Sequence, residues 1–377
     1  MKAGWEKKKL GDVCELINRG IAPKYIDEGG VQVLNQKCIR DHSVSYELAR
    51  RNNPELKSVP EERLIRVGDV LVNSTGTGTL GRVAQVREMP SELTTVDTHV
   101  TIVRPKEGMF YLDFFGYALI EIEEEIKNSG AGASGQTELA RDVLKNEFTI
   151  SFPESLEEQQ RIVAILDEAF AGIATATANA DKNLKNAREL FESTLQSVFA
   201  TKGEGWFETA VGEQITLQRG FDITKRQQNP GSVPVVSSGG IKSYHDKAMA
   251  KSPGVVIGRK GSLGTVYFLE KDYWPHDTTL WVKEFNNNHP KIVYYLFKGL
   301  DVSHLDSGAA NPALNRNMVH PIQVSWPSQE IQDKVIQKLD ALAEDVEKLE
   351  SVYKEKLNLL SELKQSILQK TFAGELH

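Results

Sequence analysis

The sequence is poor in cysteine, in positive charge and in long apolar runs. Two cysteines, Cys14 and Cys38, are too few for a disulfide framework or a cysteine-rich zinc site, and they fit a reducing cytoplasm. The net charge of -7 disfavours a simple polybasic nucleic-acid binder, because phosphate binding rests on clustered positive charge. No apolar run approaches the roughly 20 residues of a membrane span, and the N-terminus lacks the apolar region of a signal peptide. These absences predict a cytoplasmic protein.

The length and the distribution of charge indicate several segments. A chain of 377 residues suggests roughly two or three domains. Residues 1–150 carry a net charge of -3, residues 151–204 carry -4, residues 205–326 carry +3 and residues 327–377 carry -3. The acidity therefore lies mostly in the second and fourth segments.

The chain contains a long internal repeat. Shifting the sequence by 173 residues places 157–200 on 330–373 without a gap, with twelve identities in 44 positions. Unrelated sequences would share roughly three. The preceding segments correspond more loosely: Trp5, Leu10 and Gly11 match Trp206, Val211 and Gly212, Arg19-Gly20 matches Arg219-Gly220, GTLGRV (78–83) matches GSLGTV (261–266), Asp97-Thr98 matches Asp277-Thr278, and Pro153 matches Pro327. The order is globular unit, long segment, globular unit, long segment.

The two repeated segments are predicted to be helices. Ser155-Leu-Glu-Glu158 is a capping box before an apolar-periodic run, and neither segment contains proline. Apolar or small residues recur with alternating spacings of four and three, close to the coiled-coil period. The predicted seam comprises Ile162, Leu166, Ala169, Ile173, Ala176, Ala180 and Leu184 in the first helix and Val335, Leu339, Leu342, Val346, Leu349, Tyr353 and Leu357 in the second.

Chain order sets the direction of the helices if they pair. Each helix could lie on its own globular unit instead, but 44 residues outrun one small domain. Because the first helix runs from the first unit to the second and the other returns, paired helices must be antiparallel. At 1.5 Å per residue each spans ~66 Å, about two turns of DNA. An approximate two-fold relation between similar units suits duplex DNA as a partner.

These motifs resemble the specificity subunit of type I restriction–modification systems. The resemblance covers essentially the whole chain. Its carriers are Trp5 with Leu10-Gly11-Asp12, VGDVLV (67–72), IGRKGSLGTVYF (257–268), YWPHDTTLWV (273–282), SGAANPALN (307–315), EEQQRIVAILD (157–167) and LKQSILQKTFAGEL (363–376).

The resemblance implies an α+β architecture and a non-catalytic role. Two similar α/β target recognition domains, residues 1–152 and 205–326, are joined by conserved spacer helices, residues 153–204 and 327–377, in an antiparallel coiled coil with pseudo-two-fold symmetry. Each domain reads half of a bipartite target in double-stranded DNA. The helices set the spacing and bind two methyltransferase subunits, and motor-nuclease subunits complete the restriction enzyme. S-adenosylmethionine, ATP and Mg²⁺ belong to those partners, leaving this chain without a cofactor or metal of its own.

Two other functions compete with this interpretation. Gly76-Thr-Gly78-Thr-Leu-Gly81 fits the dinucleotide fingerprint, which favours a nucleotide-dependent enzyme, but that site needs a following helix. Here Arg82–Val86 is strand-like, so we predict a glycine turn between strands, and likewise for Gly258–Gly264. A coiled-coil scaffold that binds only proteins is the other alternative. His276-Asp277 with His289 lacks metal-ligand spacing.

The candidate DNA contacts lie near the predicted glycine turns. Lys, Arg, Ser and Thr suit phosphates, and Arg, Lys, Asn, Gln and Ser suit base edges. The Arg259-Lys260 pair in a glycine-flanked turn is the leading candidate. The full set is Arg19, Lys24, Asn35, Gln36, Lys37, Asn73, Ser74, Thr75, Thr77 and Arg82 in the first unit, and Arg219, Lys225, Arg226, Gln227, Ser237, Ser238, Lys242, Tyr244, Arg259, Lys260 and Ser262 in the second.

Overall fold

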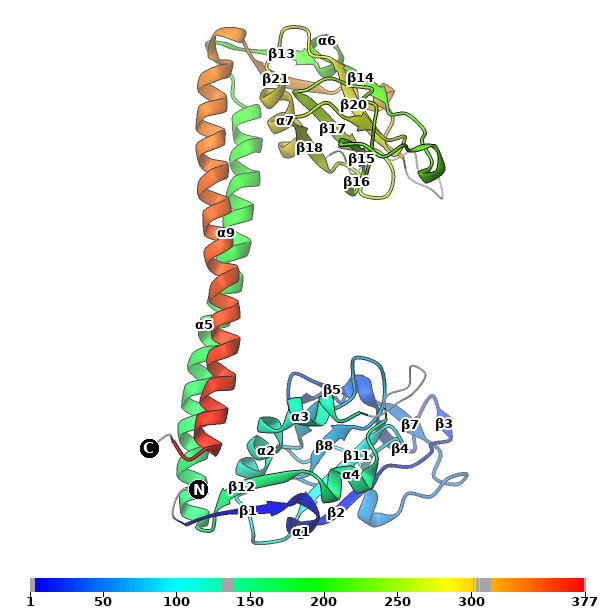
Figure 1. The fold of residues 1–377 in the computed structure, drawn as a ribbon, viewed down its shortest axis with the longest axis vertical. Helices are drawn as coiled ribbons and strands as arrows, with labels where there is room; N and C mark the ends of the chain where they lie inside the picture. The colour runs from blue at the N-terminus through cyan, green and yellow to red at the C-terminus, as the bar shows by residue number, and fades with distance from the viewer. Residues whose placement is uncertain (1–3, 131–137, 301, 303–304, 306–312, 376–377) are drawn as a thin grey trace. The chain divides into compact units, whose positions relative to one another are not determined.

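The chain divides into two compact units. Figure 1 shows the computed structural model, which describes residues 4–130, 138–300, 302, 305 and 313–375. The first unit comprises Met1–Ala178 with Asn358–His377, and the second comprises Asn179–Leu357. Each unit holds one globular domain and part of each of two long helices. The finer division at residues 152, 204 and 326 stays a prediction.

The first globular domain is built on a four-stranded antiparallel sheet in the order β2-β11-β8-β9. A second sheet has the order β10-β4-β7-β3, with β10 and β4 parallel. Strand β1 pairs with β12, and β5 with β6. The elements are β1 (Trp5–Lys9), α1 (Leu10–Val13), β2 (Cys14–Arg19), β3 (Tyr25–Ile26), β4 (Val31–Leu34), β5 (Ile39–Arg40), β6 (Ser43–Val44), β7 (Arg50–Asn52), β8 (Val70–Asn73), β9 (Val83–Gln85), β10 (Thr94–Val96), β11 (Val100–Pro105), α2 (Leu112–Glu121), α3 (Glu123–Asn128), α4 (Arg141–Asn146) and β12 (Thr149–Pro153).

The second globular domain repeats this plan. Its main sheet has the order β14-β20-β17-β18, and β15 runs parallel to β19 as β4 does to β10. Strands β13 and β21 pair with Trp206 opposite Pro327, as Trp5 lies opposite Pro153 in the first domain. The elements are β13 (Trp206–Ala210), α6 (Val211–Gln214), β14 (Thr216–Arg219), β15 (Val233–Ser237), β16 (Gly240–His245), β17 (Gly254–Gly258), β18 (Val266–Leu269), β19 (Trp274–Pro275), β20 (Thr279–Glu284), α7 (Pro290–Gly299), α8 (Arg316–Val319) and β21 (Gln323–Pro327).

In both domains the central sheet is covered on both faces. Successive strand residues point to opposite faces. Val70 and Val72 of β8 pack with α2, whereas Leu71 packs toward the second sheet. In the second domain, Val255 packs with α7 while Val256 joins Val236 of β15 on the other face. Strands buried on both sides read as continuous apolar runs, which is what VLV and GVVIG show.

A glycine closes the end of the first strand of each main sheet. A Cβ on Gly20 would overlap the carbonyl oxygen of Val96, and a Cβ on Gly220 would overlap that of His276. The Gly220 amide donates to Thr279 O at 3.0 Å. This close approach explains why Arg-Gly recurs in the repeat, and it fixes the arginine that precedes each glycine.

Replacing Gly220 by alanine is expected to destabilise the second domain by about 1–3 kcal/mol or more, because the added methyl group has no space. Denaturant unfolding of the full chain measures this. Gly239→Ala is the matched control, since a Cβ there meets no heavy atom within 4 Å. Equal stability of the two variants would contradict the close-approach explanation.

The two long helices confirm the predicted repeat. Helix α5 spans Leu156–Phe199 and α9 spans Gln329–Phe372, each with 44 residues. A shift of 173 superposes both ends. The predicted cap is also present, since the Glu158 amide donates to Ser155 Oγ at 3.3 Å.

Identical residues in the repeat anchor each helix to its own globular domain. Gln159 is fully buried, accepts from the Tyr111 amide at 2.8 Å and donates to Pro153 O at 2.9 Å. Gln332 accepts from the His289 amide at 2.7 Å and donates to Pro327 O at 3.1 Å in the same way. One of the twelve identities is thus a buried polar anchor in each helix.

A tyrosine–aspartate bond recurs just over two turns further along each long helix. Tyr117 of α2 donates to Asp167 at 2.5 Å, and Tyr295 of α7 donates to Asp340 at 2.5 Å. Burial, with the hydrogen bond to Asp167, raises the pKa of Tyr117 to about 12. Burial opposes the charged form of Asp340, but hydrogen bonds from Lys291 and Tyr295 outweigh it and lower the pKa. Both tyrosines therefore stay protonated donors at neutral pH.

The helices pack together in antiparallel fashion. In the first unit the start of α5 shares a core with the end of α9, through Leu166, Leu368 and Phe372. In the second unit the end of α5 meets the start of α9, through Leu195 and Leu339.

One predicted seam residue was wrong. Leu349 is 43% exposed. Glu350 occupies the position facing α5 instead, bonded to Arg188 Nε at 2.9 Å. Two series of positions fit one face of α9 equally well. The series 346, 350, 353 and 357 keeps the alternating spacing of threes and fours, as does the predicted series through Leu349. The other seam residues are buried or half-buried.

The ion pair at Glu350 gives the helix pair a pH dependence. Hydrogen bonds from Arg188 and Lys354 lower the pKa of Glu350 from 4.5 to about 2. A carboxyl with a lowered folded-state pKa stabilises the fold above its unfolded pKa, and this contribution is lost as pH falls toward 2.

Replacing Glu350 by glutamine is expected to cost about 0.2–1 kcal/mol at pH 7, because the pair is largely solvent-exposed. Glu355→Gln, on the same helix and without an ion pair among the described residues, is the control. Denaturant unfolding at pH 7 and near pH 2 tests this, and a Glu350→Gln deficit that persists undiminished near pH 2 would contradict it.

One property of α5 differs from the sequence expectation. A window of this helix reaches a mean hydropathy of 1.3, so by length and composition alone it is apolar enough to cross a membrane. Only 17% of that window is buried within the chain. Its apolar residues are interrupted by charged and polar ones, so the sequence shows no continuous apolar run there.

Candidate nucleic-acid interface

In the first domain two predicted contact residues, Gln36 and Thr75, meet at the turn between β10 and β11. Gln36 donates to Thr75 Oγ1 at 2.6 Å, and Thr75 Oγ1 lies 2.7 Å from His99 Nδ1. Arg82 donates to Gly78 O at 3.0 Å, which braces the glycine turn. Asn35 caps a short 3₁₀ helix by accepting from the Lys37 amide. Lys24, Lys37 and Thr77 are exposed.

Two first-domain predictions need correction. Asn73 and Ser74 are both 0% exposed. Asn73 donates to Gln36 O at 3.2 Å, and Ser74 Oγ lies 2.5 Å from Thr101 Oγ1. They end a fully buried strand, so they hold the turn from beneath and present no side chain to a DNA surface.

In the second domain three predicted segments meet at Asp277-Thr278. The backbone amides of Arg259 and Lys260 donate to Thr278 O at 2.8 and 3.1 Å, and the Ser238 amide donates to Thr278 Oγ1. Arg219 reaches Asp277 Oδ2 at 3.3 Å. The structure thus brings Arg219, Ser237, Ser238, Arg259, Lys260 and Ser262 to one region.

The remaining second-domain candidates are exposed. Lys225, Arg226 and Gln227 form a 3₁₀ turn, in which Gln227 accepts from the Thr224 amide at 2.9 Å. Lys242 and Tyr244 lie on β16, where Tyr244 is 55% exposed. None of these five bonds to the Asp277-Thr278 region among the described residues, so whether they join one interface stays a prediction.

Sequence reasoning missed several polar residues beside these clusters. Arg316, the first residue of α8, lines a cavity of about 480 Å³ with Arg219 and Arg259. Arg141 occupies the equivalent place on α4 and donates to Asn18 at 3.0 Å. No local motif predicts these arginines, because α4 packs beside β2 and α8 beside β14 only in the folded domains. Residues 307–312 of the SGAANPALN stretch lie outside the described residues.

The glycine turns have the predicted strand-turn-strand form. Gly76–Gly81 joins β8 to β9, and Gly258–Gly264 joins β17 to β18. Neither turn leads into a helix, so the dinucleotide fingerprint lacks the helix N-terminus that holds a pyrophosphate. His289 caps α7 by accepting from the Lys291 amide at 3.2 Å. Within the described ranges, no three His, Cys, Asp or Glu side chains are placed to hold a metal ion.

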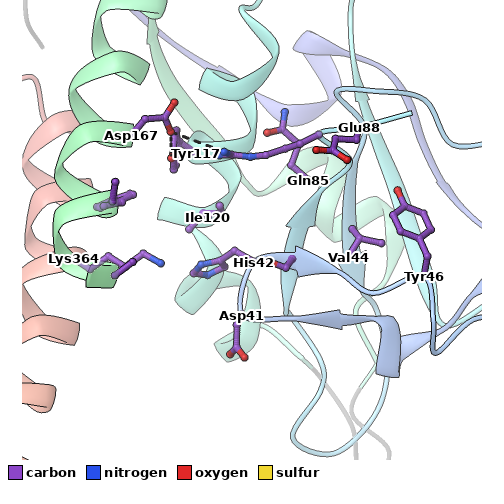
Figure 2. Close-up of a pocket in the computed structure, with 15 residues that line it drawn as sticks. Asp41, His42, Val44, Tyr46, Gln85, Glu88, Tyr117, Ile120, Asp167 and Lys364 are labelled. Atoms are coloured by element: carbon purple, nitrogen blue, oxygen red, sulfur yellow. Dashed lines mark hydrogen bonds and ion pairs between the residues drawn. The ribbon is translucent and has the colours of Figure 1, made fainter. Parts of the chain in front are cut away.

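Equivalent grooves lie where α2 and α7 meet the long helices. The first-unit groove, of about 600 Å³, is lined by His42, Tyr117, Asp167, Phe170 and Lys364 among others. Figure 2 shows Lys364 pointing toward His42, and the bond between Tyr117 and Asp167 at the wall. The second-unit groove, of about 720 Å³, includes the repeat equivalents Tyr295, Asp340, Ala343 and Phe191. Each unit thus carries the same hollow.

Comparison with known proteins decides the family. The sequence matches the type I restriction modification DNA specificity domain over residues 2–185 and 203–359. The chain belongs to this family. It is therefore the DNA specificity subunit of a type I restriction–modification system, with two target recognition domains and a non-catalytic part in the complex.

Solved structures share the whole fold of this specificity subunit. A chain from a study of complex assembly and conformational transition of the type I R-M system is 17% identical, with a TM-score of 0.81, covering 100% of this chain and 99% of that one. The HsdS subunit from Thermoanaerobacter tengcongensis is 18% identical, with a TM-score of 0.59, covering 100% and 98%. Among curated proteins none matches the sequence significantly.

Proposed function

We propose that each target recognition domain of this chain reads one half of a bipartite DNA target in the major groove, while α5 and α9 set the number of unread base pairs between the halves. The observation that carries this proposal is the repeat. The main sheets of both domains have the same strand order, α1, α2 and α4 have counterparts in α6, α7 and α8, and both domains place an arginine and a glycine turn at equivalent points. Two similar readers on paired helices suit a split target.

We further propose that two methyltransferase subunits dock on the helices, one beside each domain. The equivalent grooves at Tyr117 and Tyr295 support two copies of one partner. The apolar but little-buried window of α5 supports it too, because such a face is stabilised when another helix covers it. Motor-nuclease subunits would join this core to complete the restriction enzyme.

The partners would supply the chemistry. Adenine-N6 methylation needs S-adenosylmethionine, and the motor-nuclease needs ATP and Mg²⁺; we place all three on partner subunits and none on this chain. As part of a restriction–modification complex the subunit acts inside the cell, and the two buried free cysteines suit the cytoplasm.

The isolated chain is expected to bind DNA weakly. Its globular segments carry net charges of -3 and +3, and its helical segments are acidic, so the chain offers little phosphate attraction of its own. Fluorescence anisotropy with a target duplex should show tight, salt-sensitive binding only after methyltransferase subunits are added. A nonspecific duplex of equal length is the control. Tight, salt-sensitive, specific binding by the chain alone would contradict the proposed division of labour.

A further inference from the structure

We propose that Arg219, at the end of β14, is a specificity-determining residue that reads a guanine in the half-target bound by the second domain. The inference rests on the proposed function, since it assumes that this domain reads DNA bases.

Arg219 lines the cavity of about 480 Å³. Polar groups from three chain segments line this cavity: Gln218 and Asp222, Arg259, and Asn315 and Arg316. Amide and guanidinium groups are the donors and acceptors that base edges recognise.

Two carboxylates hold Arg219 in place. Its Nη2 atom donates to Asp222 at 3.2 Å and to Asp277 Oδ2 at 3.3 Å. Asp277 is fixed in turn, since its other oxygen lies 3.0 Å from His276 Nδ1. The Nη1 and Nε atoms of Arg219 donate to no group among the described residues, and the side chain is 50% exposed. The guanidinium of Arg219 is thus held by two carboxylates at one nitrogen, and its other two nitrogens can donate to a ligand that approaches from solvent.

The carboxylates favour a base over a backbone phosphate. An anionic phosphate beside Asp222 and Asp277 would meet like charge, whereas the neutral O6 and N7 acceptors of guanine would not. Asp222, 78% exposed, is also free to accept from the N4 amino group of the paired cytosine. The arrangement therefore matches one G·C pair.

The equivalent arginine of the first domain is already occupied. Arg19 donates to Glu138 at 2.7 Å and to Leu139 O at 2.8 Å. The repeat bridges Thr75 to Glu138 and Lys260 to Ala313, so alanine stands in the second domain where the first has that glutamate. Arg219 thus lacks the carboxylate that engages Nη1 of Arg19, so its Nη1 donor is left for a base.

The test uses the complex reconstituted with its methyltransferase subunits and a randomised duplex library, sequenced for methylated adenine. Arg219→Lys keeps the positive charge but loses the planar guanidinium and its free Nη1 donor. We expect the preference for guanine to fall roughly 10-fold or more at one position of one half-target, with all other positions unchanged. Lys271→Ala is the control, because Lys271 is exposed in the second domain, lies outside the cavity and is not a candidate contact; it should leave every base preference intact.

Several outcomes would overturn the proposal. An unchanged motif with Arg219→Lys and with Arg219→Ala excludes base reading by this residue. Uniformly weaker binding with a salt slope lowered by about 1 for Arg219→Ala assigns it to a phosphate instead. If the wild-type complex itself methylates without sequence preference, the proposed function fails, which is a distinguishable result. Thermal unfolding of each variant excludes loss of fold.

Discussion

Exchanging the first globular domain for that of a relative should change one half of the methylated target and leave the other half as it was. The exchange should be cut between Pro153 and α5. Strands β1 and β12 pair there, with Trp5 opposite Pro153, so the two ends of the domain lie side by side. Replacing residues 1–153 therefore moves a complete sheet system, with its Arg19 and glycine turn.

Helix anchors set the design of this swap. Gln159 and Leu166 of α5 and Phe372 of α9 pack into the first domain, so the donor domain should keep the buried surface that meets them. The reciprocal exchange of residues 205–327 is the matched control and should change only the other half. Base-resolution methylation sequencing reads both results. A change in both halves, or in neither, would show that the domains do not read independently.

Lengthening both helices by one heptad should lengthen the unread spacer. Seven residues add about 10.5 Å to a helix, the rise of about three base pairs. The matched insertion points are after Ala178 in α5 and after Leu357 in α9, where both helices pass from one compact unit to the other. A whole heptad keeps the apolar seam in phase.

The control inserts the same heptad in α5 alone. This shifts one helix against the other, separates pairs such as Arg188 and Glu350, and should abolish methylation by breaking the assembly. The paired insertion should restore methylation with a longer spacer. Restored activity with an unchanged spacer would refute the ruler role of the helices.

The repeated helices and the glycine turns between strands could be predicted from the sequence. Twelve identities over 44 residues marked both helices to within one residue, and glycine turns marked the strands on either side of Gly76–Gly81 and Gly258–Gly264. Identity also marked Gln159 and Gln332, although their role as buried anchors emerged only from the partners that they meet.

The rest depends on distant contacts. Strand β8 ends at Asn73, which is covered by the turn of Gln36, 37 residues away, and Ser74 follows it and bonds to Thr101. Arg316 gains its place beside Arg219 through the packing of α8, and nothing near it in the sequence signals this. Leu349 fell outside the seam because two phases of the apolar pattern fit almost equally, and packing chose the one with Glu350.

The most direct test of the central claim is the methylome of a host that expresses this chain with its cognate methyltransferase subunits. Base-resolution sequencing should reveal one bipartite motif with methylated adenine in both halves, separated by a fixed run of unread base pairs. The motif should vanish when this chain alone is omitted. A continuous motif, or a bipartite motif that persists without the chain, would contradict the account.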